Sequence, residues 1–357
     1  MISLLQDLWQ LFFRMAPHPT KPRLITFGNP GRKSPVLVTV NSSLTVRRLS
    51  KALRGVDCYL LVAPAGGINV WCGSVGGHFN VESVISIIKT SGVEGYVDHR
   101  RLVLPQLCAA SVTSRELHRR VGWSAQFGPV RAEDIPAYLR NGSRVSAEMT
   151  EVRYSAKDRL EMAFAMSGSI IIRYALFPLL LFGPGGVSRF AAAVFIFSAA
   201  LHLFNEKVPA EKHTHKSFFI CALALTVLAF TVRAAGLALT TEVISLIVIL
   251  PGASLLVGNA YSGYTPFKQC GYSKQFYGFK PLKIDIVAED CTGCTLCDWV
   301  CPVDCFEQVN LAPGGRVYVM AKPSNCVECG ACLVQCPTGA VVDLNANSPG
   351  KVSAGCA

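Results

Sequence analysis

The chain carries the same cysteine run twice near its carboxyl end, and this repeat is the strongest constraint on its fold. Residues 291–302 read CTGCTLCDWVCP and residues 326–337 read CVECGACLVQCP, so each follows the spacing C-x2-C-x2-C-x3-C-P. Closely spaced thiolates of this kind bind the irons of a cubane cluster, and the Pro turns the chain away after the last ligand. The repeat therefore predicts two [4Fe–4S] clusters.

The double run is typical of two-cluster bacterial ferredoxins, in which the fourth Cys of each run binds the other cluster. The predicted ligands are Cys291, Cys294, Cys297 and Cys336 for the first cluster, and Cys326, Cys329, Cys332 and Cys301 for the second. Structural zinc is the alternative, but zinc sites usually pair C-x2-C motifs. Cys305 is interpreted as a packed thiol beside the second cluster, with a ligand role as the lesser alternative.

Apolar segments dominate the middle of the chain. Of all residues, 51% are hydrophobic and only 16% are charged, which is typical of a chain with membrane segments. We expect four spans, at about 160–182, 187–204, 217–235 and 243–260. Arg173 weakens the first, because a mid-membrane Arg costs about 2.5–3.5 kcal/mol. Residues 157–172 therefore either span the bilayer or lie at its interface.

The net charge of +11 is unevenly distributed, since residues 284–357 contain 8 acidic and 3 basic residues. Lys and Arg gather beside the apolar segments, which favours a membrane surface over nucleic acid as the partner. The positive-inside rule places both termini and the 205–216 loop in the cytoplasm. The grouped Cys residues indicate metal ligation in a reducing compartment. We expect a multi-pass protein of the inner (cytoplasmic) membrane, with both terminal domains on the cytoplasmic side.

Short apolar runs alternate with helical patterns from about residue 35 to residue 140. Strands are expected at 35–40 and 58–63, and a helix at 81–92. This alternation predicts a Rossmann-like α/β domain with a mainly parallel sheet. Such sheets bind ligands at the loops that leave the carboxyl ends of their strands. The glycine-rich loop 67–79 follows the second strand in this way.

The predicted organisation has five parts. The amino-terminal segment lacks a basic start and a cleavage site, so we interpret it as an amphipathic surface helix and not a signal peptide. The parts are an amphipathic segment (1–22), the α/β domain (23–150), a four-helix transmembrane domain (151–260), an interfacial linker (261–283) and an α+β two-cluster ferredoxin domain with a Cys-containing tail (284–357).

Five stretches of the α/β region resemble the corrinoid-binding protein family of microbial mercury methylation. They read FGNPGRKSPVLVTVN, GVDCYLLV, GINVWC, HRRLVLPQL and FGPVRAEDIPAYL, within about residues 24–140. That family joins the domain to membrane helices and works with a separate two-cluster ferredoxin, so this chain is similar to the two partners fused. The family's fold is related to that of the corrinoid iron–sulfur proteins of acetyl-CoA metabolism.

The resemblance implies that Cys72, in GINVWC, is the lower axial ligand of a corrinoid cobalt and the catalytic residue. A thiolate beneath cobalt favours release of a methyl group as a carbanion or radical, which an electrophile such as Hg(II) requires. The implied corrinoid-binding residues are Asn69, Val70, Trp71, Cys72, Gly73, Gly76 and Gly77. Without the resemblance, Cys72 would be interpreted as an inert thiol in a glycine-rich turn.

The implied function is methyl transfer from cobalt to Hg(II), with the fused ferredoxin reducing the corrinoid for turnover. An upstream methyl-donor methyltransferase, an electron-donating reductase and membrane lipid are the implied partners. Cys270 and Cys356 are candidate Hg(II) ligands, because thiolates suit soft metals. The family continues after its Cys with Ala, a small residue, Gly and Lys, whereas this chain reads Gly73-Ser74-Val75-Gly76. This departure leaves open another methyl acceptor, and a membrane electron carrier without a corrinoid is the second alternative.

Overall fold

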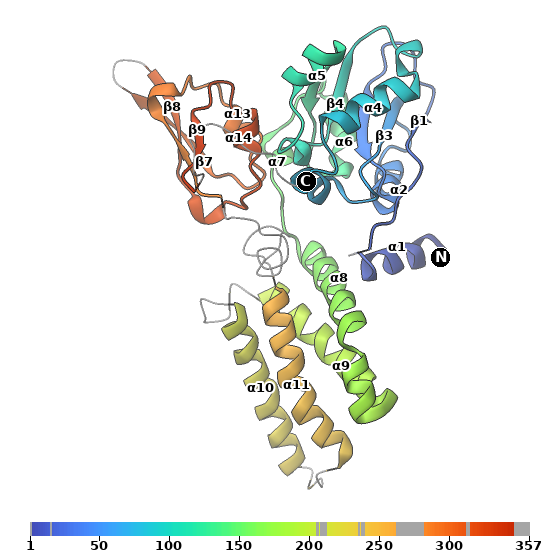
Figure 1. Cartoon of the computed structure of the whole chain (residues 1–357), viewed down its shortest axis with the longest axis vertical. Coiled ribbons are helices and arrows are strands. Elements are labelled where there is room, and N and C mark those ends of the chain that lie inside the picture. The colour runs from blue at the N-terminus through green and yellow to red at the C-terminus, as the bar shows by residue number, and fades with distance from the viewer. Residues whose placement is uncertain are drawn as a thin grey trace. The chain divides into compact units, whose positions relative to one another are not determined.

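The computed structural model describes residues 2–14, 16–204, 207, 213–234, 236, 240–261, 282–311 and 315–345. The chain forms two compact units (Figure 1). The helical unit comprises Met1–Ala16 and Tyr154–Phe279. The sheet unit comprises Pro17–Arg153 and Lys280–Ala357, and so contains both the α/β domain and the ferredoxin domain.

The α/β domain is built on a five-stranded sheet of order β1-β3-β2-β4-β5. Its strands are β1 (Arg23–Phe27), β2 (Val36–Val40), β3 (Cys58–Ala63), β4 (Arg101–Leu104) and β5 (Ser124–Phe127). Strand β1 pairs antiparallel with β3, and the other pairs are parallel. The prediction of a mainly parallel sheet is therefore confirmed, and β1 is an added antiparallel edge strand.

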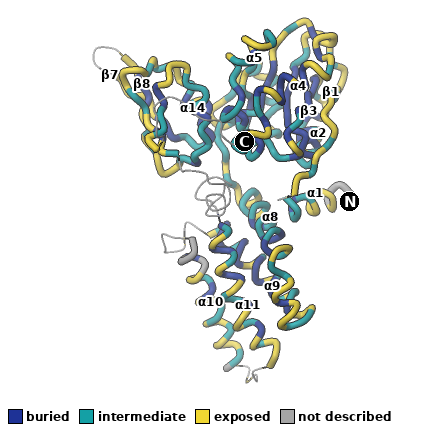
Figure 2. The backbone as a smooth tube through the Cα atoms, in the orientation of Figure 1, coloured by how far each residue is buried: buried dark blue, intermediate teal, exposed yellow. Residues whose placement is uncertain are grey.

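Helices cover both faces of this sheet. They are α2 (Ser43–Ala52), α4 (Val81–Ser91), α5 (Ser114–Val121) and α6 (Ile135–Arg140), followed by the short α7 (Ala147–Thr150). Every residue of β2 and β3 is buried (Figure 2), as expected for parallel strands that are covered on both faces. Helix α4 ends at Gly92, whose φ of 64° gives the left-handed cap that glycine adopts readily.

The ferredoxin domain consists of two small antiparallel pairs and two short helices. Strands β6 (Ile284–Ile286) and β9 (Val341–Asp343) pair, and β7 (Phe306–Leu311) pairs with β8 (Gly315–Met320). Helices α13 (Leu296–Trp299) and α14 (Ala331–Gln335) each lie within one cysteine run. The sequence repeat is thus also a structural repeat, in which a turn and a short helix present successive thiols.

The helical unit contains α1 (Ile2–Phe12), α8 (Ala156–Tyr174), α9 (Leu176–Phe204), α10 (His213–Ala234) and α11 (Thr241–Ala260). Helices α9 and α11 are long and apolar enough to cross a membrane, and a shorter apolar stretch of α10 covers Phe218–Val232. Four spans therefore remain a prediction. Helix α1 packs on α8 through the rings of Phe12 and Phe164, whose centroids are 5.7 Å apart.

The boundary between the first two expected spans is different in the structure. We expected one helix to run to residue 182, but α8 ends at Tyr174 and α9 begins at Leu176. The break we expected near residue 183 is a kink inside α9, where Gly183 has φ 63° and ψ −163° and Pro184 follows. Pro cannot donate a helical hydrogen bond, and glycine tolerates positive φ, so the pair bends the helix.

Candidate functional site

Cys72 lies in a short helix, α3 (Val70–Val75), at the carboxyl edge of the sheet after β3. We expected a loop here, because glycine disfavours helices. Asn69 explains the difference: its side-chain oxygen accepts a 3.0 Å hydrogen bond from the Cys72 backbone N–H and caps the helix. Cys72, Val70 and Trp71 are all partly exposed. The site thus presents one thiol on a capped helical turn at the edge where such sheets bind ligands.

The chain that leads into α3 is held by Asn41, which follows the end of β2. The Asn41 side-chain oxygen accepts hydrogen bonds from the backbone N–H groups of Ala65 and Gly67, at 2.8 and 3.0 Å. Gly67 has φ +77°, and a Cβ there would lie 2.5 Å from the Pro19 nitrogen. The absence of a side chain at Gly67 therefore allows Pro19 to approach the backbone closely. The sequence signal for Asn41 was its place directly after a strand, which we did not use.

The other glycines near Cys72 have separate roles. Gly77 adopts φ 75° in the turn that follows α3, and Gly76 has an ordinary φ of −80° as the last cap residue of this helix. Gly73 is buried inside α3, and a Cβ there would be in ordinary contact with Phe79 at 3.4 Å. The approach of Pro19 accounts for Gly67 and the positive φ accounts for Gly77, while a Cβ at Gly76 would lie 2.9 Å from the Cys72 carbonyl oxygen. A role of Gly73, Gly76 and Gly77 in corrinoid binding remains a prediction.

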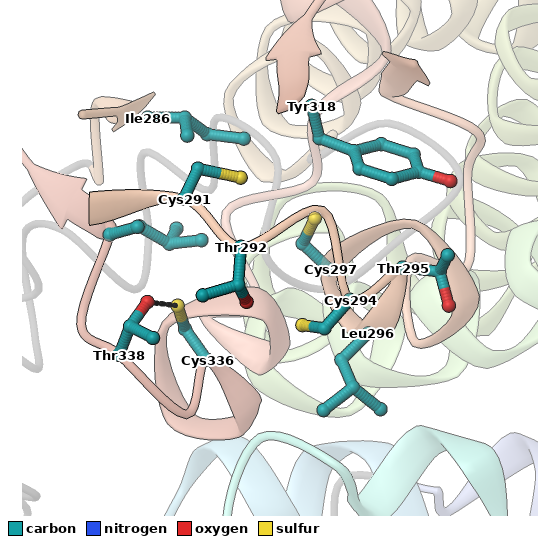
Figure 3. Close-up of a pocket in the computed structure, with 12 residues that line it drawn as sticks. Ile286, Cys291, Thr292, Cys294, Thr295, Leu296, Cys297, Tyr318, Cys336 and Thr338 are labelled. Atoms are coloured by element: carbon teal, nitrogen blue, oxygen red, sulfur yellow. Dashed lines mark hydrogen bonds between the residues drawn. The ribbon is translucent and has the colours of Figure 1, made fainter. Parts of the chain in front are cut away.

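The first predicted ligand set lines one cavity of the ferredoxin domain (Figure 3). Its thiols are Cys291, Cys294, Cys297 and Cys336, and Thr338 and Tyr318 also line it. The Cys336 sulfur lies 3.7 Å from the Thr338 hydroxyl oxygen. Three of the thiols come from the first run and Cys336 comes from the second, so the structure brings together residues from the two runs in the crossed pattern.

A second cavity is lined by Cys301, Cys326, Cys329 and Cys332, with Cys305 beside them. Cys305 is only 1% exposed. Hydrogen bonds with Cys301 and Cys326 raise the pKa of Cys305. Its interpretation as a packed thiol beside the second cluster remains a prediction.

The two thiol sets fit a cluster better than a single ion. Among the described residues, no group of three or more His, Cys, Asp or Glu is placed to hold one metal ion. Four thiols spread around a cavity instead suit a cubane, in which each sulfur binds a different iron. Burial raises the pKa of Cys297 to about 12 and that of Cys329 to about 12, so cluster binding must displace thiol protons.

Cys72 also fits the group that the resemblance implies. A corrin is a broad plane, so a protein donor to its cobalt must stand at an accessible edge, and the partly exposed Cys72 does so. The candidate Hg(II) ligands Cys270 and Cys356 lie outside the described residues. The sequence analysis missed Gln106 and Gln335, which join the two domains of the sheet unit through side-chain amides.

The fold and these residues define a chain with a corrinoid-binding-like α/β domain and a [4Fe–4S] dicluster domain. Residues 14–139 match the family described as CO dehydrogenase/acetyl-CoA synthase delta subunit. Residues 290–340 match the family described as 4Fe-4S dicluster domain. The second match agrees with the ferredoxin expectation, and the first agrees with the relation to acetyl-CoA metabolism.

Relatives of the α/β domain are named as gamma subunits of the acetyl-CoA decarbonylase/synthase complex. The protein from Methanopyrus kandleri is 34% identical over 125 residues, which is 34% of this chain and 27% of the relative. The protein from Methanocaldococcus jannaschii is 33% identical over 127 residues, 35% of this chain and 26% of the relative. The chain thus spans about a quarter of the length of these relatives.

Proposed function

We propose that the chain is a membrane-attached, corrinoid-dependent methyltransferase that carries its own two-cluster electron donor and methylates Hg(II). One observation supports this most: Cys72 stands on a capped helix at the carboxyl edge of the sheet, in the same compact unit as two cavities that each contain one predicted set of four ligand thiols. A single thiol at the carboxyl edge of the sheet, together with an attached ferredoxin domain, suits a metal cofactor that must be reduced in each turnover.

A bound corrinoid would supply a cobalt able to carry a methyl group and transfer it to an electrophile, and Cys72 would be the residue that holds this cobalt. The residues of the chain position the thiolate. Asn69 fixes the first turn of α3 by accepting from the Cys72 N–H. Ser74, two positions on, is buried and its hydroxyl lies 2.6 Å from that of Ser111, so the far side of α3 is tied to the chain that follows β4. The helix that carries Cys72 is thus held near both of its ends.

The thiols of the ferredoxin domain hold the two clusters in the proposed function. Cys291, Cys294 and Cys297 come from the turn and helix that begin the domain, and Cys336 reaches them from the second run. The crossed pattern ties the two halves of the domain together. Each cluster then carries one electron at a time, so two clusters match a demand for two electrons in each turnover.

Hg(II) is the preferred acceptor because the GINVWC motif and the polarity of a thiolate-bound methyl group both suit an electrophile. The sequence after Cys72 favours a second candidate, in which the same design methylates another acceptor. Ser74 stands where the resembled family has a small residue, but no Lys follows at Gly76. The acceptor is therefore the part of the proposal that needs a direct assay.

Attachment to the inner (cytoplasmic) membrane is also proposed. Helices α9 and α11 supply two candidate spans. Side chains on their outer faces are apolar, and Leu180 is 76% exposed. Leu5 and Trp9 of α1 are 61% and 62% exposed, as expected for a helix that lies in a membrane interface. A methyl-donor methyltransferase and a reductase are the proposed protein partners.

The test uses the purified full-length chain, loaded with iron–sulfur clusters and a methylated cobamide under anaerobic conditions. We expect methylmercury to form when a thiol complex of Hg(II) is added, and to fall to the corrinoid-free background in Cys72→Ala. The control is Cys58→Ala, because Cys58 is a fully buried thiol inside β3 of the same domain. Loss of the cobalt-bound methyl group without methylmercury would indicate another acceptor, and equal rates in wild type and Cys72→Ala would contradict the proposal.

A further inference from the structure

The segment of residues 106–112, here the bridging segment, lies between Cys72's helix and the ferredoxin domain. It follows the carboxyl end of β4 and packs against α3. On that side, the Ser111 hydroxyl lies 2.6 Å from the Ser74 hydroxyl and donates to the Phe79 carbonyl at 2.7 Å. The bridging segment is therefore fixed to the helix that carries Cys72.

On its other side, the bridging segment binds the ferredoxin domain through two glutamine side chains. The Gln335 amide donates to the carbonyl oxygens of Ala109 and Val112, at 2.6 and 2.9 Å. The Gln106 amide, only 2% exposed, donates to the Thr150 carbonyl at 2.8 Å and the Trp299 carbonyl at 3.4 Å. The two domains are thus joined by hydrogen bonds that run in both directions.

Apolar contact completes this interface. Ala109, Val300 and Ala331 are 0%, 2% and 5% exposed and form one buried cluster, against which Phe127 and Cys329 pack. Phe127 is the last residue of β5, so the ferredoxin domain covers the same carboxyl edge of the sheet from which α3 starts. Small side chains at positions 109 and 331 let the two backbones approach closely.

The two thiol sets differ in how closely they lie to this interface. Cys329 packs in the buried cluster, and Cys301 and Cys332 directly follow its members Val300 and Ala331. In the other set, only Cys336 follows an interface residue, Gln335, and Cys294 is exposed. The set of Cys301, Cys326, Cys329 and Cys332 therefore lies against the bridging segment, and the set that contains Cys294 reaches solvent.

We propose that the bridging segment fixes the direction of electron flow, an inference that rests on the proposed function. The interface set is Cys301, Cys326, Cys329 and Cys332. The cluster that this set would hold gives one electron to the cobalt of the bound corrinoid. The oxidation state of the cobalt falls by one, and the cluster is oxidised by one electron. An electron from the cluster held by the other set restores it. A low-potential one-electron reductant supplies that cluster at the exposed Cys294 side. Gln335 and Gln106 act as positioning residues that hold the exit cluster against the bridging segment.

The experiment compares Gln335→Ala, Ala109→Glu and the control Gln308→Ala, since Gln308 is exposed on β7, away from the interface. Two readouts are taken on the full chain. Amide hydrogen exchange of residues 106–112 is measured without corrinoid, and cobalt reduction after photoreduction of a deazaflavin is followed by absorbance in the cluster- and cobalamin-loaded protein. Iron content shows that each variant retains its clusters.

We expect exchange in residues 106–112 to rise about tenfold in Gln335→Ala, because the two hydrogen bonds from Gln335 to the carbonyl oxygens of Ala109 and Val112 are lost. Cobalt reduction should slow in Gln335→Ala and slow further in Ala109→Glu, which buries a charge at the contact, while Gln308→Ala matches wild type. Unchanged exchange would overturn the interface, and faster exchange with unchanged cobalt reduction in both variants would overturn the electron route. A wild type that binds no cobalamin would instead overturn the proposed function.

Discussion

The Cys72 site and the ferredoxin cavities present the same atom, a cysteine sulfur, in different ways. Each cavity brings together four thiols of the two cysteine runs, and the spacing of these runs already defines them in the sequence. Cys72 is one thiol on a six-residue helix, and its position depends on Asn69, Asn41 and the close approach of Pro19 at Gly67. A multidentate cluster site is therefore specified locally, whereas a single-ligand cofactor site depends on the surrounding fold.

The largest effect should come from removing the single thiol. In Cys72→Ala we expect the cobalt–thiolate absorption band of the corrinoid-loaded protein to disappear, because no other described thiol of the α/β domain is accessible to a corrinoid. The remaining described thiols of that domain, Cys58 and Cys108, are both fully buried. Iron content should stay at the wild-type level. An unchanged band would show that another residue binds the cobalt.

Removing one thiol from a cavity should have a smaller, partial effect. Cys332→Ser takes one of four ligands from the interface set, and we expect iron per chain to fall by about half as one of two four-iron clusters is lost. Cys305→Ser is the matched control, since Cys305 lines the same cavity but is interpreted as a packed thiol. An equal loss of iron in the control would make Cys305 a ligand instead.

The backbone under Cys72 can be tested with two glycines of equal conformation. Gly67 and Gly55 both have φ +77°, but a Cβ at Gly55 would meet nothing within 4 Å. We expect Gly55→Ala to destabilise the α/β domain by about 1–2 kcal/mol through left-handed strain. Gly67→Ala should cost about 1–3 kcal/mol more, because Pro19 must move.

The measurement is the free energy of opening of β2 and β3 from amide hydrogen exchange. A corrinoid titration of the same variants then shows whether displacement of Pro19 reaches Cys72. Equal destabilisation by the two substitutions would mean that Pro19 moves without cost in free energy. The contact between Gly67 and Pro19 would then not fix the chain that leads into α3.

The smallest expected effect concerns pH and a buried thiol. Burial, with a smaller contribution from Asp57, raises the pKa of Cys58 from 9.0 to about 12. The unfolded thiol therefore loses its proton between these values while the folded thiol keeps it, so stability falls as pH rises above 9. From about pH 8 to about pH 10, wild type should lose about 1 kcal/mol more unfolding free energy than Cys58→Ala. Parallel pH profiles of the two proteins would contradict this.

Part of the fold was predictable because the signals are local. The buried strands β2 and β3 are continuous apolar runs, and helix α4 ends on a glycine with the expected left-handed φ. Strands β1 and β4 were missed as strands because each mixes Arg with a short apolar run. Helix α3 was missed because its glycines obscured the capping role of Asn69.

The relation between the two domains of the sheet unit could not be predicted. Gln335 and Ala109 are 226 positions apart, and nothing in the spacing of either segment indicates their hydrogen bond. The cysteine spacing defined each thiol set, but which set lies against the bridging segment depends on Val300 and Ala331, whose apolar side chains carry no such signal in the sequence. The contact residues of the proposed electron route are thus defined only by the tertiary structure.

The most direct test of the account is metal analysis of the purified full-length protein after anaerobic reconstitution with iron, sulfide and a cobamide. The account predicts one cobalt and about eight irons per chain, with a cobalt–thiolate band in the absorption spectrum. Protein that is rich in iron but retains no cobalt after the excess cobamide is removed would contradict it, and would leave an iron–sulfur electron carrier as the function of the chain.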